Sequence, residues 1–343
     1  MFRLDVLLGA AVVAVLGVAA CGGDSGGGPA DASPDAVVRP DAATVDPTGA
    51  HYNFVADSII MPTSSSEATA LGLDIDGDGD VDNRLGAVVA ALSGGGGGDV
   101  NVELQSQIDT GELILLANLQ ATSLGDAANT GLWVWKGDSP MPAPCADATD
   151  TVCRRHLDGT GTFTVAAADP EASLIVGAVA GGHVSGGPGF AKLEVPLGFA
   201  STPLTLELIG ARVEADVSET GFANGRLAGA VTEDYIQSSV LPQLVAIMGD
   251  ILAEDCTGTS PSCCEDGSSG EQIINLFDAD GDCDVSITEL QQSSLLTSLL
   301  APDVDLLDEE GFYLPNRDGV QDSTSLGVAF TAVPALYPLP PGI

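Results

Sequence analysis

Oxygen-bearing side chains recur at alternate positions between residues 278 and 289 of this 343-residue chain. A hard divalent cation of calcium's size takes about six to eight oxygen ligands, and alternate residues of a tightly turning loop can point them toward one centre. The first three acids offer carboxylates, and the next offers its backbone carbonyl. A serine follows with a hydroxyl or a bridging water, and a glutamate closes the set with two carboxylate oxygens. These candidate ligands for Ca²⁺ are Asp278, Asp280, Asp282, Asp284, Ser286 and Glu289.

Two apolar stripes flank this loop. Residues 271–277 and residues 290–300 both place large apolar side chains at helical spacing, which predicts a helix on either side. Together the helix, the twelve-residue loop and the second helix resemble an EF-hand, and the resemblance implies calcium as the ligand. The apolar positions are Ile273, Ile274 and Phe277 before the loop, and Leu290, Leu295 and Leu299 after it.

One position departs from the EF-hand pattern. The sixth residue of the loop is Cys283, where an EF-hand carries a glycine with a positive φ angle. A side chain in that conformation costs roughly 1 to 2 kcal/mol. Binding of a divalent ion can offset this cost, and a disulfide through Cys283 would hold the residue in place. The alternative interpretation is a solvated acidic turn without an ion.

A second acidic run, between residues 74 and 82, follows the same logic. Gly79 occupies the turn position, but Leu85 stands where a closing bidentate acid belongs. The run resembles the half-loops of dockerins and of thrombospondin-type calcium repeats, in which further ligands come from elsewhere in the chain. The resemblance implies a second Ca²⁺. Its candidate ligands are the carboxylates of Asp74, Asp76 and Asp78, the carbonyl of Asp80, and a carboxylate or bridged water at Asp82.

A third group of acids lies between residues 303 and 310 and fits no loop template. Asp303, Asp305 and Asp308 are followed by two glutamates, and Asp318 and Asp322 come after them. We expect a solvated acidic loop there.

The N-terminus has the features of a secretory signal peptide over residues 1–20. Arg3 precedes an apolar run from residue 6 to residue 18, and small residues follow. Residues 18–21, Val-Ala-Ala-Cys, resemble a bacterial lipobox, in which Cys21 becomes the lipidated first residue of the mature protein. The alternatives are ordinary secretion and a membrane span, for which the apolar run is short.

Residues 21–50 are rich in Gly, Pro, Asp and Ala and too poor in large apolar residues to form a core, so we expect a flexible tether. Lipobox, tether and D-x-D-G-D loops together resemble surface lipoproteins of myxobacteria, chiefly over the first 85 residues. The resemblance implies attachment to the bacterial cell envelope, as an outer membrane lipoprotein held through the lipid on Cys21. It implies no activity.

The composition is strongly acidic, with 10 Lys and Arg against 49 Asp and Glu and a formal net charge of −39. This charge repels nucleic acid phosphates, so a nucleic acid is not an expected partner. Cations are the natural counterpart, and a protein or glycan partner stays open.

Seven cysteines are present. If Cys21 carries lipid, six remain, and an exported protein can pair all of them in disulfides. Cys145 and Cys153 are close enough in sequence to close a small loop. A zinc cluster is the alternative, but the chain has no C-x-x-C pair and no neighbouring histidine. The other four, whose pairing stays open, are Cys256, Cys263, Cys264 and Cys283.

The middle of the chain predicts short strands. Residues 204–208 and 213–217 alternate apolar and polar side chains with a period of two. Apolar residues at helical spacing predict a helix from about residue 233 to residue 252, and Pro242 predicts a kink in it. Further strands are predicted at 113–116, 132–135, 163–165, 174–179, 193–197 and 326–333, and short helices at 83–92 and 102–108.

The expected fold class is α+β: a β-rich sandwich or partial barrel with flanking helices and an EF-hand helix-loop-helix near the C-terminus. After the tether, residues 51–255 are expected to form the β-rich domain. Residues 256–343 should form a disulfide-tied EF-hand region and a C-terminal strand.

The sequence contains few residue patterns that are typical of catalytic sites. The three histidines, His51, His156 and His183, are widely separated in sequence, and no H-E-x-x-H helix is present. A glycosidase would need only two carboxylates, but aromatic residues, common in sugar-binding clefts, make up 4% of the chain. We therefore expect a calcium-binding envelope protein with a structural or binding role, and no enzyme. The alternatives are a dockerin-like partner-binding module and an extracellular hydrolase with an unfamiliar motif.

Overall fold

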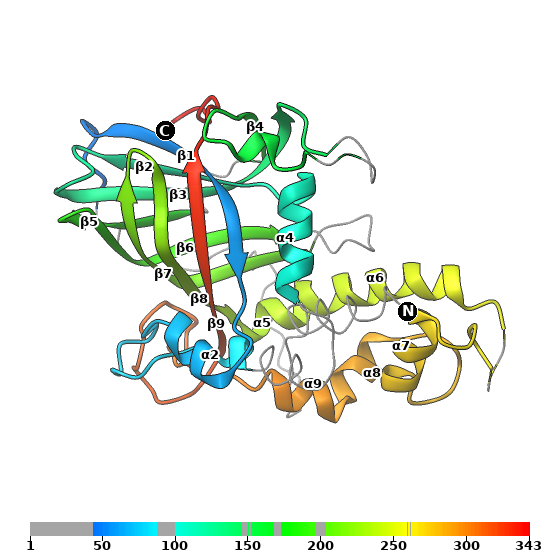
Figure 1. Cartoon of the computed structure of the whole chain (residues 1–343). Coiled ribbons are helices and arrows are strands. Elements are labelled where there is room, and N and C mark those ends of the chain that lie inside the picture. Colours follow the sequence, from blue (N-terminus) through cyan, green and yellow to red (C-terminus); the bar gives the residue numbers. More distant parts are fainter. Residues whose placement is uncertain are drawn as a thin grey trace.

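A closed antiparallel β-barrel forms the centre of the computed structural model (Figure 1). The structure describes residues 44–87, 100–145, 150, 152–167, 173–195, 204–258, 260 and 262–343. Neighbouring strands follow the order β2-β1-β9-β8-β7-β6-β5-β3, and pairing of β2 with β3 closes the ring. The eight barrel strands are β1 (Ala50–Ile60), β2 (Leu115–Ala121), β3 (Ala127–Met141), β5 (Leu174–Ala180), β6 (His183–Val195), β7 (Leu204–Ser218), β8 (Gly221–Thr232) and β9 (Ser323–Pro334).

The closed ring corrects the expected sandwich or partial barrel. A ninth strand, β4 (Thr162–Ala167), pairs with β3 outside the ring. The two strands expected at 204–208 and 213–217 are one strand, β7, in which a register shift lies between Ile209 and Arg212. Gly210 within this shift has φ +61, a conformation that glycine adopts without strain.

Two barrel strands were not predicted. β8 is built largely from Gly and Ala, and β1 carries an irregularity at Asp57, so neither has a clean alternation of large apolar residues. β9, expected as a late strand, pairs with β1 on one side and β8 on the other. The C-terminal strand is therefore part of the same barrel as the earlier strands.

Short helices surround the barrel. The helix expected at 102–108 is α4, and residues 84–87 are helical at the start of the one expected at 83–92, whose remainder lies outside the described residues. The helix expected at 290–300 breaks at Ser293, whose extended backbone ends α8 and whose hydroxyl caps α9. The helices are α2 (Ser65–Leu71), α4 (Val100–Thr110), α5 (Glu233–Tyr235), α6 (Leu241–Asp255), α7 (Ser269–Phe277), α8 (Ile287–Gln292) and α9 (Ser294–Leu299), with a 3-10 turn at Arg155–Leu157.

The long helix expected from residue 233 is continuous from α5 to α6. A π-helical turn, Ile236–Val240, joins them directly before Pro242. Proline lacks a backbone N–H, so the local hydrogen-bond pattern must change around it. The run Glu233–Asp255 is long and apolar enough by composition to cross a membrane, yet 44% of its most apolar window is buried within the protein.

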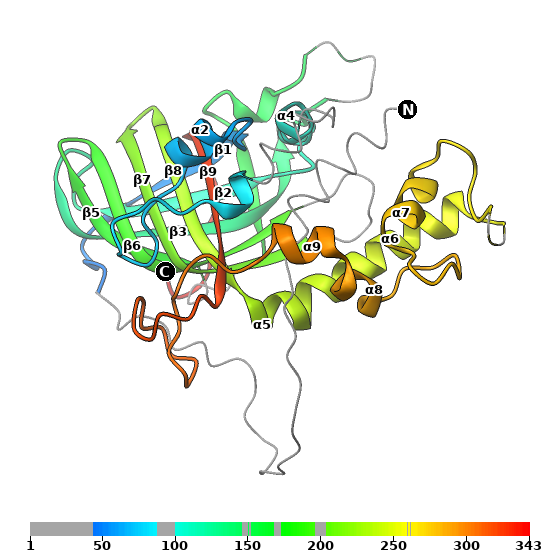
Figure 2. The same cartoon turned by 90° about the horizontal axis from the view of Figure 1, so that it is seen from below.

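One core joins the barrel to the helices. Inward side chains such as Phe54 and Leu208 belong to the same buried cluster as Leu244 and Met248 on α6 and Phe277 on α7. In both views α6 leads away from the barrel, and α7 and α8 gather along it (Figures 1 and 2). The acidic loop at 278–286 is thus carried by helices that are packed into the main core.

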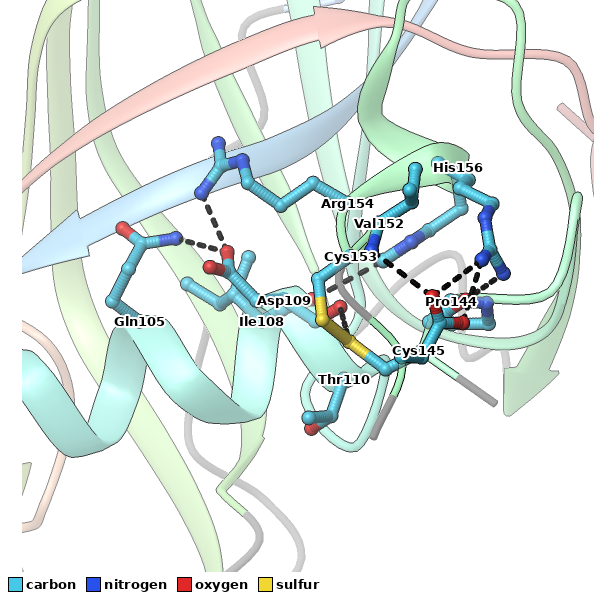
Figure 3. Close-up of a disulfide and its surroundings, with 12 residues drawn as sticks. Gln105, Ile108, Asp109, Thr110, Pro144, Cys145, Val152, Cys153, Arg154 and His156 are labelled. Carbon is cyan, nitrogen blue, oxygen red and sulfur yellow. Dashed lines mark hydrogen bonds and ion pairs between the residues drawn. A yellow bond between two sulfur atoms is a disulfide. The ribbon is translucent and has the colours of Figure 1, made fainter. Parts of the chain in front are cut away.

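The predicted disulfide between Cys145 and Cys153 is confirmed. It lies beside the C-terminal end of α4, where Asp109 accepts hydrogen bonds from Gln105 and from Arg154 (Figure 3). The second donor also forms an ion pair, with 2.5 Å between Nη1 of Arg154 and Oδ1 of Asp109. The disulfide therefore closes the loop after β3, and the ion pair fastens that loop to α4.

Candidate metal centre

Three carboxylates converge in the loop between α7 and α8. One oxygen each from Asp278, Asp280 and Asp282 lies within 4.8 Å of the others. Asp278 is half-buried, whereas the other two side chains are exposed. Three carboxylate oxygens at this separation can share a divalent cation.

Backbone amides hold the first ligand in place. Oδ1 of Asp278 accepts hydrogen bonds from the N–H of Gly281 at 2.6 Å and of Asp282 at 3.2 Å, and Oδ2 accepts from Cys283 at 3.0 Å. Asp280 accepts from the N–H of Asp282, and Asp282 accepts from that of Asp284. Each acid thus stabilises the turn that follows it, and the loop is ordered around its own carboxylates.

Glu289 connects the two ends of the loop. Its Oε1 accepts from the N–H of Ala279 at 2.8 Å, and its Oε2 accepts from the N–H and the hydroxyl of Ser286 at 2.8 and 2.9 Å. The hydroxyl of Ser286 in turn accepts from the N–H of Glu289, which completes a capping box at the start of α8. The predicted closing ligand therefore lies across the loop, beside its first turn.

The remaining predicted ligand in this loop acts within a turn. The side chain of Asp284 accepts from the N–H of Val285 at 2.8 Å, and the hydrogen bonds of the described residues give no role to its backbone carbonyl. Val285 itself is buried, with 2% of its surface exposed, as an apolar residue at that position should be.

Cys283 adopts the left-handed conformation expected at the sixth position. Its φ is +72°, and it is bonded to Cys263. Cys256 and Cys264 form the third disulfide, and Cys256 follows the last residue of α6. The two bridges decide the pairing that the sequence left open, and they tie the acidic loop to the end of α6.

Apolar side chains anchor both flanking helices. Ile273 and Phe277 on α7 and Leu290 on α8 are buried in the core cluster that includes α6. Phe277 directly precedes the first acid of the loop, and Leu290 directly follows Glu289. The two ends of the loop are therefore held by the core, while the carboxylates between them face solvent.

The electrostatics of the loop reflect crowding of like charges. Partial desolvation raises the pKa of Asp280, and the charges of Asp282, Glu289 and Asp278 raise it further. Desolvation also acts to raise the pKa of Glu289, but hydrogen bonds from Ser286, Ala279 and Asp280 outweigh it and hold that pKa below its ordinary value. The described ion pairs lie elsewhere in the molecule. A bound cation would relieve the repulsion among these acids.

The second acidic run also brings three carboxylates together. One oxygen each from Asp74, Asp76 and Asp78 lies within 4.8 Å of the others. Asp76 is buried, with only 7% of its surface exposed. Asp74 accepts from the N–H groups of Gly77 and Gly79, as Asp278 does in the other loop. Both acidic runs thus use the same local hydrogen bonding.

The other two predicted ligand residues of this run, Asp80 and Asp82, also form hydrogen bonds within the loop. The N–H of Asp80 donates to Asp78 at 2.7 Å. Asp82 pairs with Leu73 across the base of the loop, and its carboxylate accepts from the N–H of Ile75 at 2.7 Å. The structure therefore places Asp82 as a clamp on the loop and does not group its carboxylate with the other three.

Burial makes Asp82 sensitive to pH. Desolvation raises its pKa to about 7, and the nearby charges of Asp76, Asp303 and Asp78 add to that effect against the hydrogen bond from Ile75. A carboxyl group whose pKa is higher in the folded than in the unfolded chain favours folding while it is protonated. Its contribution is complete below about pH 4 and is lost as the pH rises to about 7.

We therefore expect the Asp82→Asn variant to lose less stability than the wild type between pH 4.5 and pH 7.5 when chelator is present. Asparagine keeps an acceptor for the N–H of Ile75 but cannot ionise. The difference between the two proteins should grow by at most about 1.4 kcal/mol per pH unit. Urea unfolding midpoints at both pH values measure it, and identical pH dependence of the two proteins would contradict the assignment.

Three acids that were expected in a solvated loop are shielded from solvent, Asp305 fully and Asp303 and Asp322 in part. Asp303 accepts from the N–H and hydroxyl of Ser325, and Asp322 accepts from the N–H groups of Leu306 and Leu307. Desolvation raises the pKa of both carboxyls. Asp305 is only 4% exposed. The expectation was wrong for these residues because they stabilise the segment leading into β9, a role that no local spacing reveals.

The histidines do not assemble a catalytic site. Nδ1 of His51 lies 2.9 Å from Asn118, and Nε2 of the buried His156 lies 3.1 Å from the carbonyl of Ile108. His183 pairs with Asp216 at 3.0 Å on the exposed surface of the barrel. Each has its own partner, so the described residues supply no shared histidine site.

Neither a family model, nor a curated protein, nor a solved structure matches this chain. The proposed lipidation site, Cys21, lies outside the described residues.

Proposed function

We propose that this protein binds Ca²⁺ through an EF-hand formed by α7, the loop from Asp278 to Glu289 and α8, and that the ion has a structural role. The observation that carries the proposal is the convergence of three carboxylates within 4.8 Å in a loop of EF-hand spacing. In this assignment Asp278, Asp280 and Asp282 contribute side-chain oxygens, and Glu289 contributes both of its carboxylate oxygens. Asp284 contributes its carbonyl, and Ser286 a hydroxyl or a bridged water.

The donor set favours calcium over softer metals. Every candidate ligand in the loop is an oxygen, and the nearby cysteines are engaged in disulfides and offer no thiolate. Zinc prefers sulfur and nitrogen donors. Magnesium demands a small octahedral shell and retains several waters, whereas calcium accepts the larger, irregular shell that a loop of carboxylates provides.

The surroundings favour a structural ion over a signalling ion. The loop is bonded to Cys263, the adjoining bridge reaches the end of α6, and both flanking helices are buried in the main core. A calcium sensor must move its helices when the ion binds. Two disulfides and a shared core oppose such a movement, so an affinity of about 10⁻⁴ to 10⁻³ M, typical of extracellular modules, would be sufficient.

A second calcium ion is proposed at Asp74, Asp76 and Asp78. The burial of Asp76 supports it, because a buried carboxylate is costly unless it is paired or coordinated. Asp80 can add its carbonyl, and Asp82 can add a bridged water while it clamps the base of the loop. The ion would then fix the segment between α2 and the helical residues 84–87.

The cellular setting is proposed from the sequence. The lipobox at residues 18–21 supports a lipid anchor on Cys21 in the bacterial cell envelope, where disulfides are stable and calcium is available. A structural or binding role fits this setting. In the alternative, dockerin-like role, the calcium-bound protein would also bind a partner protein. Capture of a partner in a pull-down only when calcium is present would distinguish this role from a purely structural one.

Calorimetric titration with calcium tests both sites. The chelator-treated protein is expected to bind two ions, and the variants Asp280→Asn and Asp76→Asn are each expected to bind one. Each substitution removes a negative ligand and keeps the size of the side chain. Binding of one ion by the wild type would remove the second site, and binding of none would overturn the proposal.

A further inference from the structure

The interior of the barrel contains an apolar cavity of about 110 Å³. Strand β9 lines it with four side chains at alternate positions, Leu326, Val328, Phe330 and Ala332. Successive residues of a strand point to opposite faces, so these four share the inner face of the barrel. Leu104 on α4 also contributes to the wall.

The side chains around the cavity are incompletely packed. Val328 and Phe330 point inward in a closed barrel and are nevertheless only partly buried, as is Ala117 on β2. Protein interiors are close-packed, and voids larger than a water molecule are few. Phe222 borders the cavity, and its ring centroid lies 4.6 Å from that of Phe54 and 5.9 Å from that of Phe330.

The chemistry of the wall selects an apolar occupant. Every lining residue that the structure describes is Ala, Val, Leu, Ile, Met or Phe. A buried water needs about two to four polar partners, and this wall offers none from its side chains. A ligand with a buried hydroxyl or charge would lose its hydrogen bonds to water without replacement. A hydrocarbon, in contrast, would restore the dispersion contacts that the void lacks.

We propose that the barrel interior binds one small uncharged hydrocarbon group of about four to six carbon atoms, because an apolar cavity of about 150 Å³ accommodates benzene and this cavity has roughly three-quarters of that volume. An eight-stranded barrel is wide enough to hold one small ligand among its inward side chains. The site is independent of the calcium loops, since no acidic residue lines the part of the cavity that the structure describes.

Benzene is the probe for the first test, with calcium held constant. Binding is followed by the melting temperature and by the methyl NMR resonances of Leu, Val and Ile side chains. We expect benzene to raise the melting temperature and to shift the resonances of Val328 and Leu326. Phenol has nearly the same size, and we expect it to bind at least about tenfold more weakly because its hydroxyl would be buried without a partner.

Filling the cavity gives the second test. Ala117 faces the void, so Ala117→Leu is expected to weaken benzene binding at least about tenfold, because the added side chain occupies the space of the ligand. If the leucine variant does not fold, the smaller Ala117→Val tests the same position. The matched control is Ala70→Leu, at an exposed residue of α2, which should bind benzene like the wild type.

Two results would overturn the site. One is the absence of any benzene effect on the melting temperature and on the lining methyl resonances of the wild type. The other is benzene binding by a folded Ala117→Leu protein with the affinity of the wild type, which would place the ligand elsewhere.

Discussion

Calcium at 100 times the dissociation constant of the loop from Asp278 to Glu289 is expected to stabilise the wild-type protein through that loop by about 2.7 kcal/mol relative to chelator. For a folded region of nearly 300 residues that corresponds to a rise in melting temperature of about 4 to 5 °C. Glu289→Gln should remove most of this gain and leave any contribution from the Asp74, Asp76 and Asp78 site unchanged. Glutamine keeps the size and the capping position, but it replaces one carboxylate oxygen with an amide and removes the negative charge that a calcium ligand supplies.

The control for this prediction is Glu271→Gln. Glu271 occupies the same capping position in α7 that Glu289 occupies in α8, and its side chain accepts from the N–H of Gly267. It lies outside the acidic loop, so Glu271→Gln should keep the full effect of calcium. Calorimetric melting with chelator and with millimolar calcium measures all three proteins. If the wild type has the same melting temperature with chelator and with millimolar calcium, the calcium assignment is wrong.

Removal of the disulfide between Cys263 and Cys283 is expected to have the next largest effect. The bridge spans 20 residues, and loops of roughly that length are stabilised by about 3 kcal/mol when they are closed. We expect the double variant Cys263→Ser with Cys283→Gly to lose about 2 kcal/mol, because glycine relieves about 1 kcal/mol of the backbone strain at position 283 while the stabilisation from the bridge is lost. It should also bind calcium about tenfold more weakly, because about 1.4 kcal/mol of loop ordering would then accompany binding.

Two different substitutions of Cys283 distinguish the effect of losing the disulfide from the effect of backbone strain at this position. Cys283 has φ +72°, so the glycine variant should be more stable than Cys263→Ser with Cys283→Ser by about 1 kcal/mol. Removing the distant bridge, by Cys145→Ser with Cys153→Ser, should lower stability without changing calcium affinity. Unfolding in denaturant and calcium titration of the three double variants measure these effects. Equal calcium affinity in the glycine variant and the wild type would show that the bridge does not order the loop.

Local sequence patterns predicted most individual elements of the fold. The period of two in β7 and the helical spacing from residue 233 to 252 are properties of short segments, and the structure confirms both elements. The closed ring was not predictable. It depends on pairing between β1 and β9, which are about 270 residues apart, and on β8, whose small residues carry no clear periodic signal.

The candidate metal centre shows the same division. The twelve-residue spacing and the positive φ at position 283 were both contained in the loop sequence, because the ligands of such a loop are close neighbours along the chain. The pairing of Cys263 with Cys283 could not be derived, since four cysteines permit three pairings and only the positions of α6 and α7 select one.

Burial was decided by the tertiary structure alone. Asp303 and Asp305 were expected in a solvated loop, but Asp303 accepts hydrogen bonds from Ser325 on β9 and Asp305 is buried. The cavity in the barrel has the same origin, because its wall is made of side chains from several strands and from α4, which no single segment reveals. Sequence by itself determined the types and local spacing of the ligands, because these need only neighbouring residues. Tertiary structure decided which acids are desolvated, which cysteines pair and where the core is incomplete, because each of these depends on contacts between distant segments.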